Sequence, residues 1–466
     1  MEFFYIRELM CAVNGRIVAK NQDLLVNGIS IDSKTIKKGE VYFAIRGNRY
    51  DGHDFINEAV EKGASVVVCS KDIGNVAKSF RKTCSVIQTD DTIVALGAFA
   101  KAYRSKFKNV KVIGITGSNG KTTTKEMLTS ILSVRDKTIS NDGNFNNRIG
   151  LPLSVFCLTS DVRYAIFEMG TSLHGEIEIL SDIAKPDVGI ITNIGFSHLK
   201  TFISPLDVFE EKKILVENLN RNGRVIVNND DKFLKTLSTA NTHAYITFAL
   251  DTKADVCAKN IIPCADGVCF DLFYKNNCIK IVLPVKGRFN VLNALAAASC
   301  AVGFGYSLKE IKEGVENFVP PKMRMETITI NGVVLINDAY NANPSSTIQV
   351  IQAVLESYPD KEVNLVLGDM LELGDMAADY HFKLGEFICG QNIKSINLFG
   401  KMSSNTQKAI NGKNVFYSQD SDSLLRNLKT LPVNANSVFL FKASRFMRLE
   451  EIYMEFCNIL KKRGKW

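Results

Sequence analysis

The segment that most constrains the fold of this chain is residues 111–127, KVIGITGSNGKTTTKEM. Its first part is a β-branched run typical of a strand that is buried on both faces. A tight glycine turn over residues 117–120 follows, and the apolar spacing after Lys121 predicts a helix. Glycines let backbone N–H groups point at an anion, and the helix N-terminus adds partial positive charge. The segment therefore predicts a phosphate-binding loop.

In such a loop, Lys121 would reach the β- and γ-phosphates of ATP, and the Thr122 hydroxyl would bind Mg²⁺. The usual pattern has a glycine five residues before the GKT glycine, where this chain has Ile115. A purely structural turn is the alternative, but the strand before and the helix after the loop favour phosphate binding. The residues expected to contact the phosphates are Gly117, Ser118, Asn119, Gly120, Lys121, Thr122 and Thr123.

The length of 466 residues is too great for one core and favours roughly three domains. Strand and helix patterns alternate on both sides of the phosphate loop, which predicts an α/β fold with mostly parallel sheets. We expect a small α/β domain over residues 1–107, a central domain over 108–320 and a Rossmann-like domain over 321–466. Pro320 and Pro321 mark the second boundary. The last domain carries no G-x-G-x-x-G fingerprint, so a dinucleotide is not expected there.

Composition excludes several other classes of protein. The longest nearly apolar run, residues 294–305, is too short to cross a membrane, and the charged N-terminus MEFFYIRELM does not resemble a secretory signal. Eleven cysteines without a CxxC pair predict reduced thiols in a cytoplasmic protein. The net charge of +8 is best explained by general solubility, because no basic stripe with interleaved aromatics indicates a nucleic-acid interface.

Polar groups follow the predicted strands of the central domain. Residues 165–167 run into Glu168, and residues 188–191 lead on to His198. Ligands gather beyond the carboxyl ends of parallel strands, so we expect both side chains near the phosphate loop. Either could instead cap a helix or lie at the surface, but an ATP site needs Mg²⁺ ligands, which favours the metal role. A third polar segment, NDGNFNNRIGLP, lies between these strands.

Other candidates are ambiguous from the residues alone. Lys212 and Lys213 lie in an amphipathic helix, where they would ordinarily form a solvated face. Asn290 and Asn293 share one face at a helix start, as N-terminal caps or as amides that contact a base. In the first domain, Asp32-Ser33 and Asp51-Gly52-His53 fall in loops, where a turn or a helix cap is the simpler interpretation.

The motifs TGSNGKTTT, the strand-end Glu168, NIGFSHL, GRFNVLNALAA, MRME and DAYNANP, in that order, resemble the Mur ligases. These are ATP-dependent enzymes that form amide bonds in peptidoglycan precursors, and the resemblance runs from about residue 28 to about residue 450. GNFNNRIGLP, DAYNANPSS, and GDMLELGD followed by His381 are similar to the branch that adds D-alanyl-D-alanine to a UDP-linked muramoyl tripeptide. The chain departs from the family pattern at Arg148, Ile214, Phe289 and Ala443.

The resemblance implies that the first domain binds the UDP precursor, the central domain binds ATP and Mg²⁺, and the third domain brings the dipeptide. It implies catalytic roles for Lys121, His198 and Lys212, with Lys212 carbamoylated. The implied Mg²⁺ ligands are Thr122, Glu168, His198 and Lys212. Further implied ATP contacts are Asn290, Asn293, Arg324, Asp338 and Asn341. The implied substrate contacts are Ser33, Gly47, Asp51, His53, Asn144, Asn146, Asn147, His381, Lys442, Ser444 and Arg445.

The implied reaction phosphorylates the precursor's carboxylate and then transfers the acyl group to the dipeptide amine, in a monomeric cytoplasmic enzyme. Within the class, the rivals are a ligase that adds one amino acid to a shorter precursor and an enzyme like folylpolyglutamate synthase. From other classes, the rivals are a nucleotide switch and a small-molecule kinase. A GTPase switch would need an N-K-x-D motif, which this chain lacks.

Overall fold

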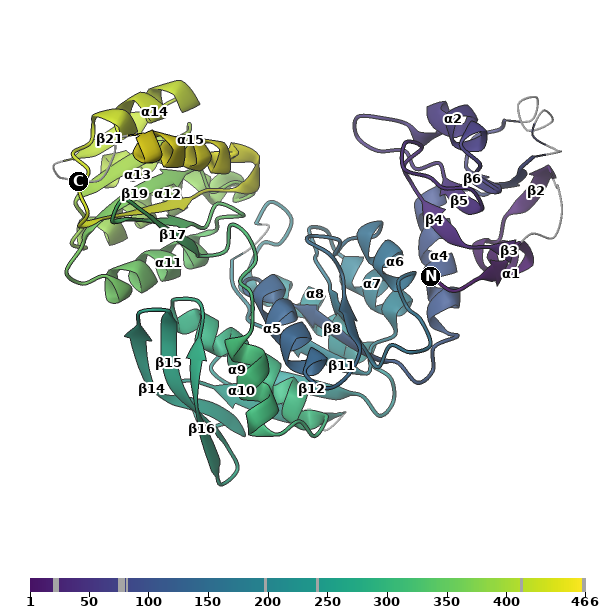
Figure 1. The fold of residues 1–466 in the computed structure, drawn as a ribbon, viewed down its shortest axis with the longest axis horizontal. Helices are drawn as coiled ribbons and strands as arrows, with labels where there is room; N and C mark the ends of the chain where they lie inside the picture. Colours follow the sequence, from purple (N-terminus) through teal and green to yellow (C-terminus); the bar gives the residue numbers. More distant parts are fainter. Residues whose placement is uncertain are drawn as a thin grey trace.

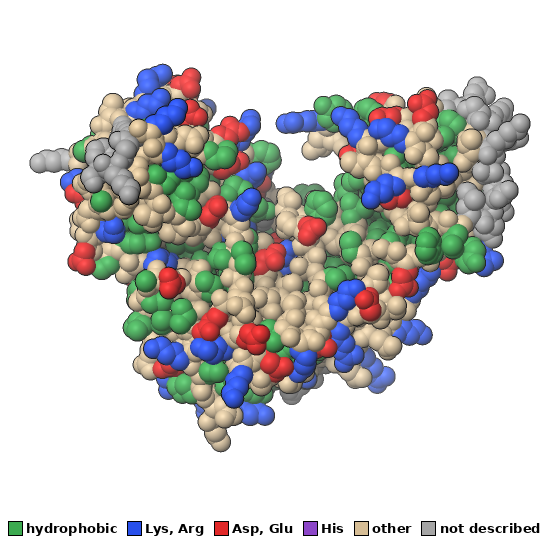
Figure 2. Space-filling view, viewed as in Figure 1, with side chains coloured by type: hydrophobic (Ala, Val, Ile, Leu, Met, Phe, Trp, Pro, Cys, Tyr) green, Lys and Arg blue, Asp and Glu red, His purple; other side chains and the backbone are tan. Residues whose placement is uncertain are grey.

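The computed structural model describes residues 1–19, 25–73, 80, 83–196, 199–239, 243–410 and 414–462. Three large sheets follow one another along the chain. Figure 1 shows the first and last sheets at opposite ends of the molecule with the middle one between them, and Figure 2 shows a wide hollow between the two ends. We call the surrounding structures the amino-terminal, central and C-terminal modules. The expected α/β architecture with mostly parallel sheets is confirmed, and the boundaries at 107 and 320 stay predictions.

The amino-terminal module is built on a five-stranded sheet in the order β2-β7-β6-β5-β4. The strands are parallel except β2, which pairs antiparallel with β7. The bounds of the strands are β2 Arg16–Ala19, β4 Gly28–Ser30, β5 Glu40–Phe43, β6 Val66–Cys69 and β7 Ser85–Gln88, and a separate pair comprises β1 Phe4–Tyr5 and β3 Leu25–Val26. The helices are α1 Ile6–Val13, α2 Ile56–Glu61, α4 Thr92–Arg104 and the 3₁₀ turn η1 Gly52–Phe55.

The central module places the phosphate loop in the middle of a nine-stranded sheet. Strand β8, Lys111–Thr116, lies between β10, Tyr164–Glu168, and β11, Val188–Ile191, and all three are parallel. Their carboxyl ends therefore meet at one edge of the sheet. The parallel part is completed by β9 Thr138–Ser140, β12 Arg224–Asn228 and β13 Ala244–Ala249. The helices are α5 Lys121–Ser133, α6 Gly150–Val155, α7 Glu176–Ala184, α8 Pro205–Glu217, α9 Arg288–Gly303, α10 Leu308–Glu316 and the 3₁₀ segment η2 Leu234–Thr239.

One part of this sheet differs from the sequence expectation. After β13 the chain does not continue as strand and helix but forms the antiparallel strands β14 Val256–Cys264, β15 Gly267–Tyr274 and β16 Asn277–Leu283. The connections at residues 265–266 and 275–276 are too short for the crossover that parallel strands need. Gly267 and Lys275 adopt positive φ values of 153° and 53°, as tight hairpins require.

The C-terminal module has a six-stranded sheet in the order β17-β18-β22-β19-β20-β21, parallel except for the β17–β18 hairpin. Its strands are β17 Glu326–Ile330, β18 Val333–Asn337, β19 Glu362–Gly368, β20 Ser395–Phe399, β21 Val415–Ser418 and β22 Ser437–Lys442. Its helices are α11 Pro344–Ser357, α12 Ala377–Cys389, α13 Ser403–Ala409, α14 Ser421–Thr430 and α15 Leu449–Lys462, with 3₁₀ turns η3 Gly374–Met376 and η4 Arg445–Met447. Helix α15 starts at Leu449, directly after Arg448, which takes a left-handed conformation.

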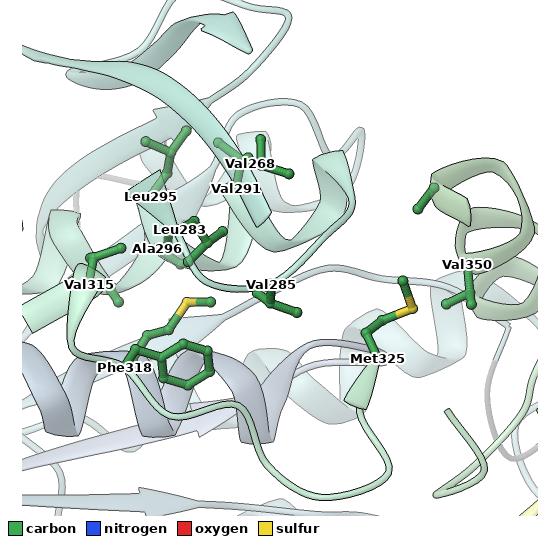
Figure 3. Packing of buried hydrophobic residues seen from close by; sticks show 14 of the residues in the cluster. Val268, Leu283, Val285, Val291, Leu295, Ala296, Val315, Phe318, Met325 and Val350 are labelled. Atoms are coloured by element: carbon green, nitrogen blue, oxygen red, sulfur yellow. The ribbon is translucent and has the colours of Figure 1, made fainter. Parts of the chain in front are cut away.

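Two buried hydrophobic clusters cross the module boundaries. In one cluster, Val285 of the central module packs with Met325 and Val350 of the C-terminal module (Figure 3). In another, the Phe99 ring of α4 packs against the tilted ring of Phe156 in the central module, with ring centroids 5.3 Å apart. Each fully buried side chain of this size contributes about 1.5–3 kcal/mol. The modules are therefore joined by apolar packing as well as by the chain.

The eleven cysteines are all free thiols, as their spacing predicted. Across the described residues, we find no helix with the length and hydropathy that a membrane span requires.

Candidate functional site

The phosphate loop connects β8 to α5 as the sequence predicted. Gly117 and Gly120 adopt φ values of 148° and 81°, a region that favours glycine. A Cβ atom at Gly117 would collide with the side chain of Thr192, and one at Gly120 would collide with Asn293. The loop thus has glycine where its backbone passes closest to the neighbouring strand end and to α9. Helix α5 begins at Lys121, so its N-terminus faces the loop.

Lys121 lies over this loop. Its Nζ donates a hydrogen bond to the Gly117 carbonyl oxygen at 2.8 Å. Burial lowers the pKa of Lys121, the charge of Arg324 lowers it further, and Glu168 acts in the opposite direction. A partly desolvated cation is a strong partner for an anion that replaces the lost water. A phosphate bound beside Lys121 would therefore stabilise the charged form of the lysine.

Glu168 is held at the carboxyl end of β10 by two side chains. Thr122 donates its hydroxyl hydrogen to one carboxylate oxygen at 2.8 Å, and Asn146 donates to the other oxygen at 2.7 Å. Glu168 is buried. The sequence expectation that Thr122 and Glu168 lie together is therefore confirmed. His198, the other expected ligand, lies outside the described residues.

The residues around Glu168 fit a magnesium ion. No group of three or more His, Cys, Asp or Glu side chains in the described part of the chain could hold a metal. Mg²⁺ is usually held by one or two carboxylates together with water and substrate phosphates rather than by an all-protein cage. A carboxylate and a hydroxyl oxygen beside a phosphate loop match that pattern.

Lys212 and Lys213 have opposite environments on α8, and the solvated-face interpretation of Lys212 is wrong. Lys212 is 2% exposed, and burial, with a further contribution from Lys121, lowers its pKa to about 7. Lys213 forms ion pairs with Glu210 and Glu217 at 2.7 and 3.3 Å, and these carboxylates raise its pKa. Of these two lysines, Lys212 is therefore the one with a large neutral fraction near pH 7.

The two asparagines of α9 do not cap that helix. The N-cap residue is Gly287, and it makes no side-chain capping bond. Asn290 donates to the Lys286 carbonyl oxygen at 2.8 Å, and Asn293 donates to Asn290 at 3.1 Å. Both side chains are buried beside the phosphate loop. Of the two alternatives left open by the sequence, the capping role is excluded.

The C-terminal module forms the opposite wall. The guanidinium carbon of Arg324 lies 4.0 Å from the Tyr340 ring centroid, and Arg324 Nε is buried without a hydrogen-bond partner among the described residues. Lys442 Nζ contacts Asp338 at 2.5 Å and the Asn341 carbonyl oxygen at 2.9 Å. Burial lowers the pKa of Lys442, and Asp338 partly offsets this effect.

A cavity of about 320 Å³ lies between these walls. It brings together residues of the central and C-terminal modules that the sequence singled out. The predicted site residues that line it are Ser118, Asn119, Gly120, Lys121, Thr122, Thr123, Asn144, Asn146, Asn147, Glu168, Asn290, Asn293, Arg324, Asp338, Asn341 and Lys442. Gly117 and Lys212 do not line this cavity, although Lys212 is close enough to Lys121 for their charges to interact.

The amino-terminal candidates do not line this cavity, and each is hydrogen-bonded within its own module. Ser33 donates to Glu58 at 2.7 Å, and the Gly47 amide donates to the Tyr50 carbonyl. His53 Nδ1 lies 2.6 Å from Asp51, while its Nε2 accepts from the Ser70 amide at 2.9 Å. Hydrogen bonds from Lys71 and His53 lower the pKa of Asp51. Asp51 and His53 therefore order their own loop.

Three C-terminal candidates also lie off the cavity wall. His381 is buried, its Nδ1 donates to the Ala377 carbonyl at 2.7 Å, and its Nε2 accepts from the Met370 amide at 3.1 Å. Burial lowers the His381 pKa, which keeps the ring neutral. Ser444 accepts from the Leu371 amide at 2.8 Å, and Arg445 pairs with Glu450 at 2.6 Å.

The cavity also contains residues that sequence reasoning did not assign. Tyr340 and Asn343 belong to the DAYNANP motif, so their position in a strand-end loop was the available signal. Phe289 lies in the GRFN motif beside Asn290. The others follow β10, precede α9, lie near the module boundary or belong to α11, and no spacing marks them: Gly170, Thr171, Ser172, Glu176, Val285, Phe318, Pro320, Pro321, Met325, Ser346, Gln349 and Val350.

Hydrogen bonds join the phosphate loop directly to the C-terminal module. Asn119 accepts from Asn343 at 2.7 Å and donates to Ser345 at 3.1 Å. Asn343 is also the N-cap of α11, where it accepts from the Ser346 amide at 2.9 Å. Asn343 thus caps the start of α11 and also donates a hydrogen bond to Asn119 in the phosphate loop of the central module.

Replacing Asn343 separates these two roles. Asn343→Asp keeps the capping oxygen but loses the donor to Asn119, whereas Asn343→Ala loses both. Because loss of an N-cap costs about 0.5–2 kcal/mol, we expect Asn343→Ala to be less stable than Asn343→Asp in denaturant unfolding. Both variants should bind ADP more weakly than the wild type in calorimetry. Wild-type ADP affinity in both would show that the contact with Asn119 has no role in the nucleotide site.

Family models match three consecutive segments of this chain. They are described as the Mur ligase family catalytic domain over residues 25–104, the Mur ligase middle domain over 115–301, and the Mur ligase glutamate ligase domain over 323–445. A Bacillus subtilis protein named UDP-N-acetylmuramoyl-tripeptide–D-alanyl-D-alanine ligase is 35% identical, with 92% of this chain and 93% of the relative covered.

Two solved structures are similar over nearly the whole chain. MurF from Acinetobacter baumannii superposes with a TM-score of 0.90 at 30% identity, covering 98% of this chain and 99% of that chain. MurF ligase from Thermotoga maritima, solved in complex with ADP, superposes with a TM-score of 0.84 at 26% identity, covering 96% and 99%.

Proposed function

The chain belongs to the Mur ligase family, and we propose that it joins D-alanyl-D-alanine to a UDP-linked muramoyl tripeptide with consumption of ATP. The product is the pentapeptide precursor of peptidoglycan. The observation that carries this proposal is the cavity in which the phosphate loop of the central module faces Arg324, Asp338 and Lys442 of the C-terminal module. The names of the relatives agree with the chemistry that this cavity can support.

The reaction needs an activated carboxylate, because a free carboxylate has no good leaving group. The precursor's terminal carboxylate attacks the γ-phosphate of ATP and gives an acyl phosphate and ADP. The dipeptide amine then attacks the acyl carbon, and phosphate leaves. Lys121 and Arg324 are placed to offset negative charge on the transferring phosphoryl group, so that catalysis is mainly positioning and electrostatic stabilisation. Closure of the modules over the cavity would exclude water and so protect the acyl phosphate from hydrolysis.

Mg²⁺ would be held by Thr122 and Glu168, and His198 stays a predicted ligand. When bound, the ion shields charge on the phosphates. Asn146 keeps the Glu168 carboxylate pointed at the loop through its 2.7 Å hydrogen bond. Thr122 orients the other oxygen of the Glu168 carboxylate through its own hydrogen bond.

Lys212 is the residue whose chemistry fits carbamoylation. Only a neutral amine adds to carbon dioxide, and the lowered pKa of about 7 gives Lys212 a large neutral fraction. The product would replace a buried cation with an anion able to ligate a cation beside Lys121. Lys213, whose ion pairs stabilise its charged form, lacks this property.

The two substrates would approach from opposite sides of the hollow. Asn144, Asn146 and Asn147 face the cavity from the central module, where the precursor's peptide would end. The loops that contain Ser33, Gly47 and Asp51 would hold the UDP end. Lys442 would face the dipeptide side, whereas buried His381 and Ser444 shape the adjacent loop through their bonds to Met370 and Leu371. We propose a cytoplasmic monomer.

The test is phosphate release from ATP and Mg²⁺ with the UDP-linked tripeptide, with and without D-alanyl-D-alanine. We expect release to need both substrates and the pentapeptide to form in equal amount. Release without the dipeptide, accompanied by a stable phosphorylated product, would indicate a kinase instead. Release driven by a single amino acid and a shorter precursor would move the chain to another branch of the family. No release with any precursor would contradict the ligase proposal.

A further inference from the structure

Lys125 is a buried cation that the reaction above does not use. It lies one turn after Lys121 in α5, and its side chain is completely buried. Its Nζ donates to the backbone carbonyl oxygen of Asn141 and lies 2.8 Å from the Glu126 carboxylate. Burial of an ammonium group is unfavourable unless protein partners replace its water. Glu126 is the next residue of α5, whereas Asn141 belongs to a different segment of the chain.

That segment is the polar loop 141–149, which contains the asparagines of the cavity wall. The Asn141 side chain donates to the carbonyl oxygens of Phe145 at 2.8 Å and Glu168 at 3.1 Å, and it accepts from the Glu168 amide at 2.9 Å. One asparagine thus joins the first turn of the loop to the end of β10. Lys125 fixes the position of Asn141 by donating a hydrogen bond to the Asn141 backbone carbonyl oxygen.

The far end of the loop is packed equally closely. A Cβ atom on Gly150 would collide with the Phe145 backbone, so the loop closes tightly on itself. Asn147 accepts from the amides of Ile149 and Gly150 at 3.0 and 2.9 Å. The loop is therefore held at both ends, and Lys125 of α5 bonds directly to its first residue, Asn141.

We propose that Lys125 is a positioning residue for the precursor: through Asn141 it places loop 141–149 beside Glu168. This inference rests on the proposed function for the identity of the precursor. A direct contact with ATP is the competing role. Lys121, Thr122 and Thr123 of α5 line the cavity, whereas Lys125 does not, and its ammonium is directed to Asn141. The residue therefore acts on the loop and not on the nucleotide.

The test compares Lys125→Met with Glu126→Gln in the full chain. Methionine keeps an unbranched apolar stem but removes the ammonium, whereas Glu126→Gln removes only the ion-pair partner and leaves the bond to Asn141. We expect Lys125→Met to raise the KM for the UDP-linked tripeptide about 10-fold, as loss of one charge-assisted hydrogen bond predicts, with the KM for ATP changed less than about twofold. Glu126→Gln should match the wild type in both constants.

Hydrogen exchange of the loop amides gives a readout that does not depend on turnover. We expect faster exchange over residues 141–150 in Lys125→Met and unchanged exchange in α5. Asn141→Ala provides a second variant if Lys125→Met does not fold, and it should shift the same KM. Unchanged loop exchange, or a rise in the KM for ATP alone, would overturn the inference. If wild-type protein turns over no precursor, the proposed function fails, while the exchange data still decide whether Lys125 holds the loop.

Discussion

Replacement of Lys121 by methionine is expected to lower kcat for ligation by roughly 10³-fold, the size seen when one preorganised group that stabilises transition-state charge is removed. The reason is geometric. Lys121 begins α5, lies over the phosphate loop and lines the cavity, so its charge acts on a phosphoryl group bound there. ADP affinity should fall by less than kcat, because backbone amides of the loop still bind the phosphates.

The measurement is steady-state phosphate release together with ADP titration calorimetry. Lys111→Met is the matched control, because Lys111 lies at the opposite end of β8 and forms a half-exposed ion pair with Asp187 at 3.6 Å. This variant should retain wild-type kcat. Full activity in Lys121→Met would contradict the assignment of the phosphate loop.

The second large effect is expected at Lys212. Lys212→Met should lower kcat by at least about 10²-fold. Lys213→Met should stay within about twofold, because the Lys213 ammonium is held in partly exposed ion pairs with Glu210 and Glu217. Carbon-13 NMR with labelled bicarbonate checks the chemistry directly. We expect a carbamate signal in the wild type and in Lys213→Met that is absent in Lys212→Met. A signal that disappears in Lys213→Met instead would reverse the assignment.

The same residue predicts a pH dependence of stability. The pKa of Lys212 is about 7 in the folded chain and near the ordinary value of 10.5 in the unfolded chain. Between these values the unfolded state binds more protons, so the free energy of unfolding rises as pH increases from 7. In buffer free of carbon dioxide, urea unfolding should show this rise in the wild type and a flatter profile in Lys212→Met. Lys121 and Lys442 contribute in the same direction, so the difference between the two proteins isolates Lys212.

The sequence predicts the phosphate loop well because its determinants are local. Strand β8, the glycine turn and α5 occupy consecutive residues, and each follows from the side chains present. The pairing of Thr122 with Glu168 also follows, since parallel neighbouring strands bring their carboxyl ends together. These features need no knowledge of how distant modules pack.

Lys212 shows where residue patterns fail. Glu210, Glu211, Lys212 and Lys213 form a charged run that is typical of a solvent-facing helix surface, yet Lys212 faces the interior. Burial of a single lysine depends on what packs against its helix, and spacing does not encode that. The antiparallel strands β14–β16 were missed for a related reason. Their apolar runs fit parallel and antiparallel strands equally well, and only the two-residue connections between them decide for antiparallel pairing.

His53 and His381 illustrate a third limit. A histidine in a polar loop looks similar in sequence whether it binds a ligand or orders the loop. In the structure, both ring nitrogens of each histidine already have partners within the same module. Three of these four partners are backbone groups, which every residue carries, so the residue types in the motif do not reveal them.

The apolar cluster shared by the central and C-terminal modules affects how this protein can be divided. Val285, Met325 and Val350 lie in one buried cluster to which both modules contribute side chains (Figure 3). A fragment that ends near residue 320 would leave Val285 and its neighbours without their covering side chains, which favours aggregation over folding. Screens for compounds that bind the nucleotide cavity therefore need the undivided chain, since a shortened protein would expose an apolar surface that binds compounds non-specifically.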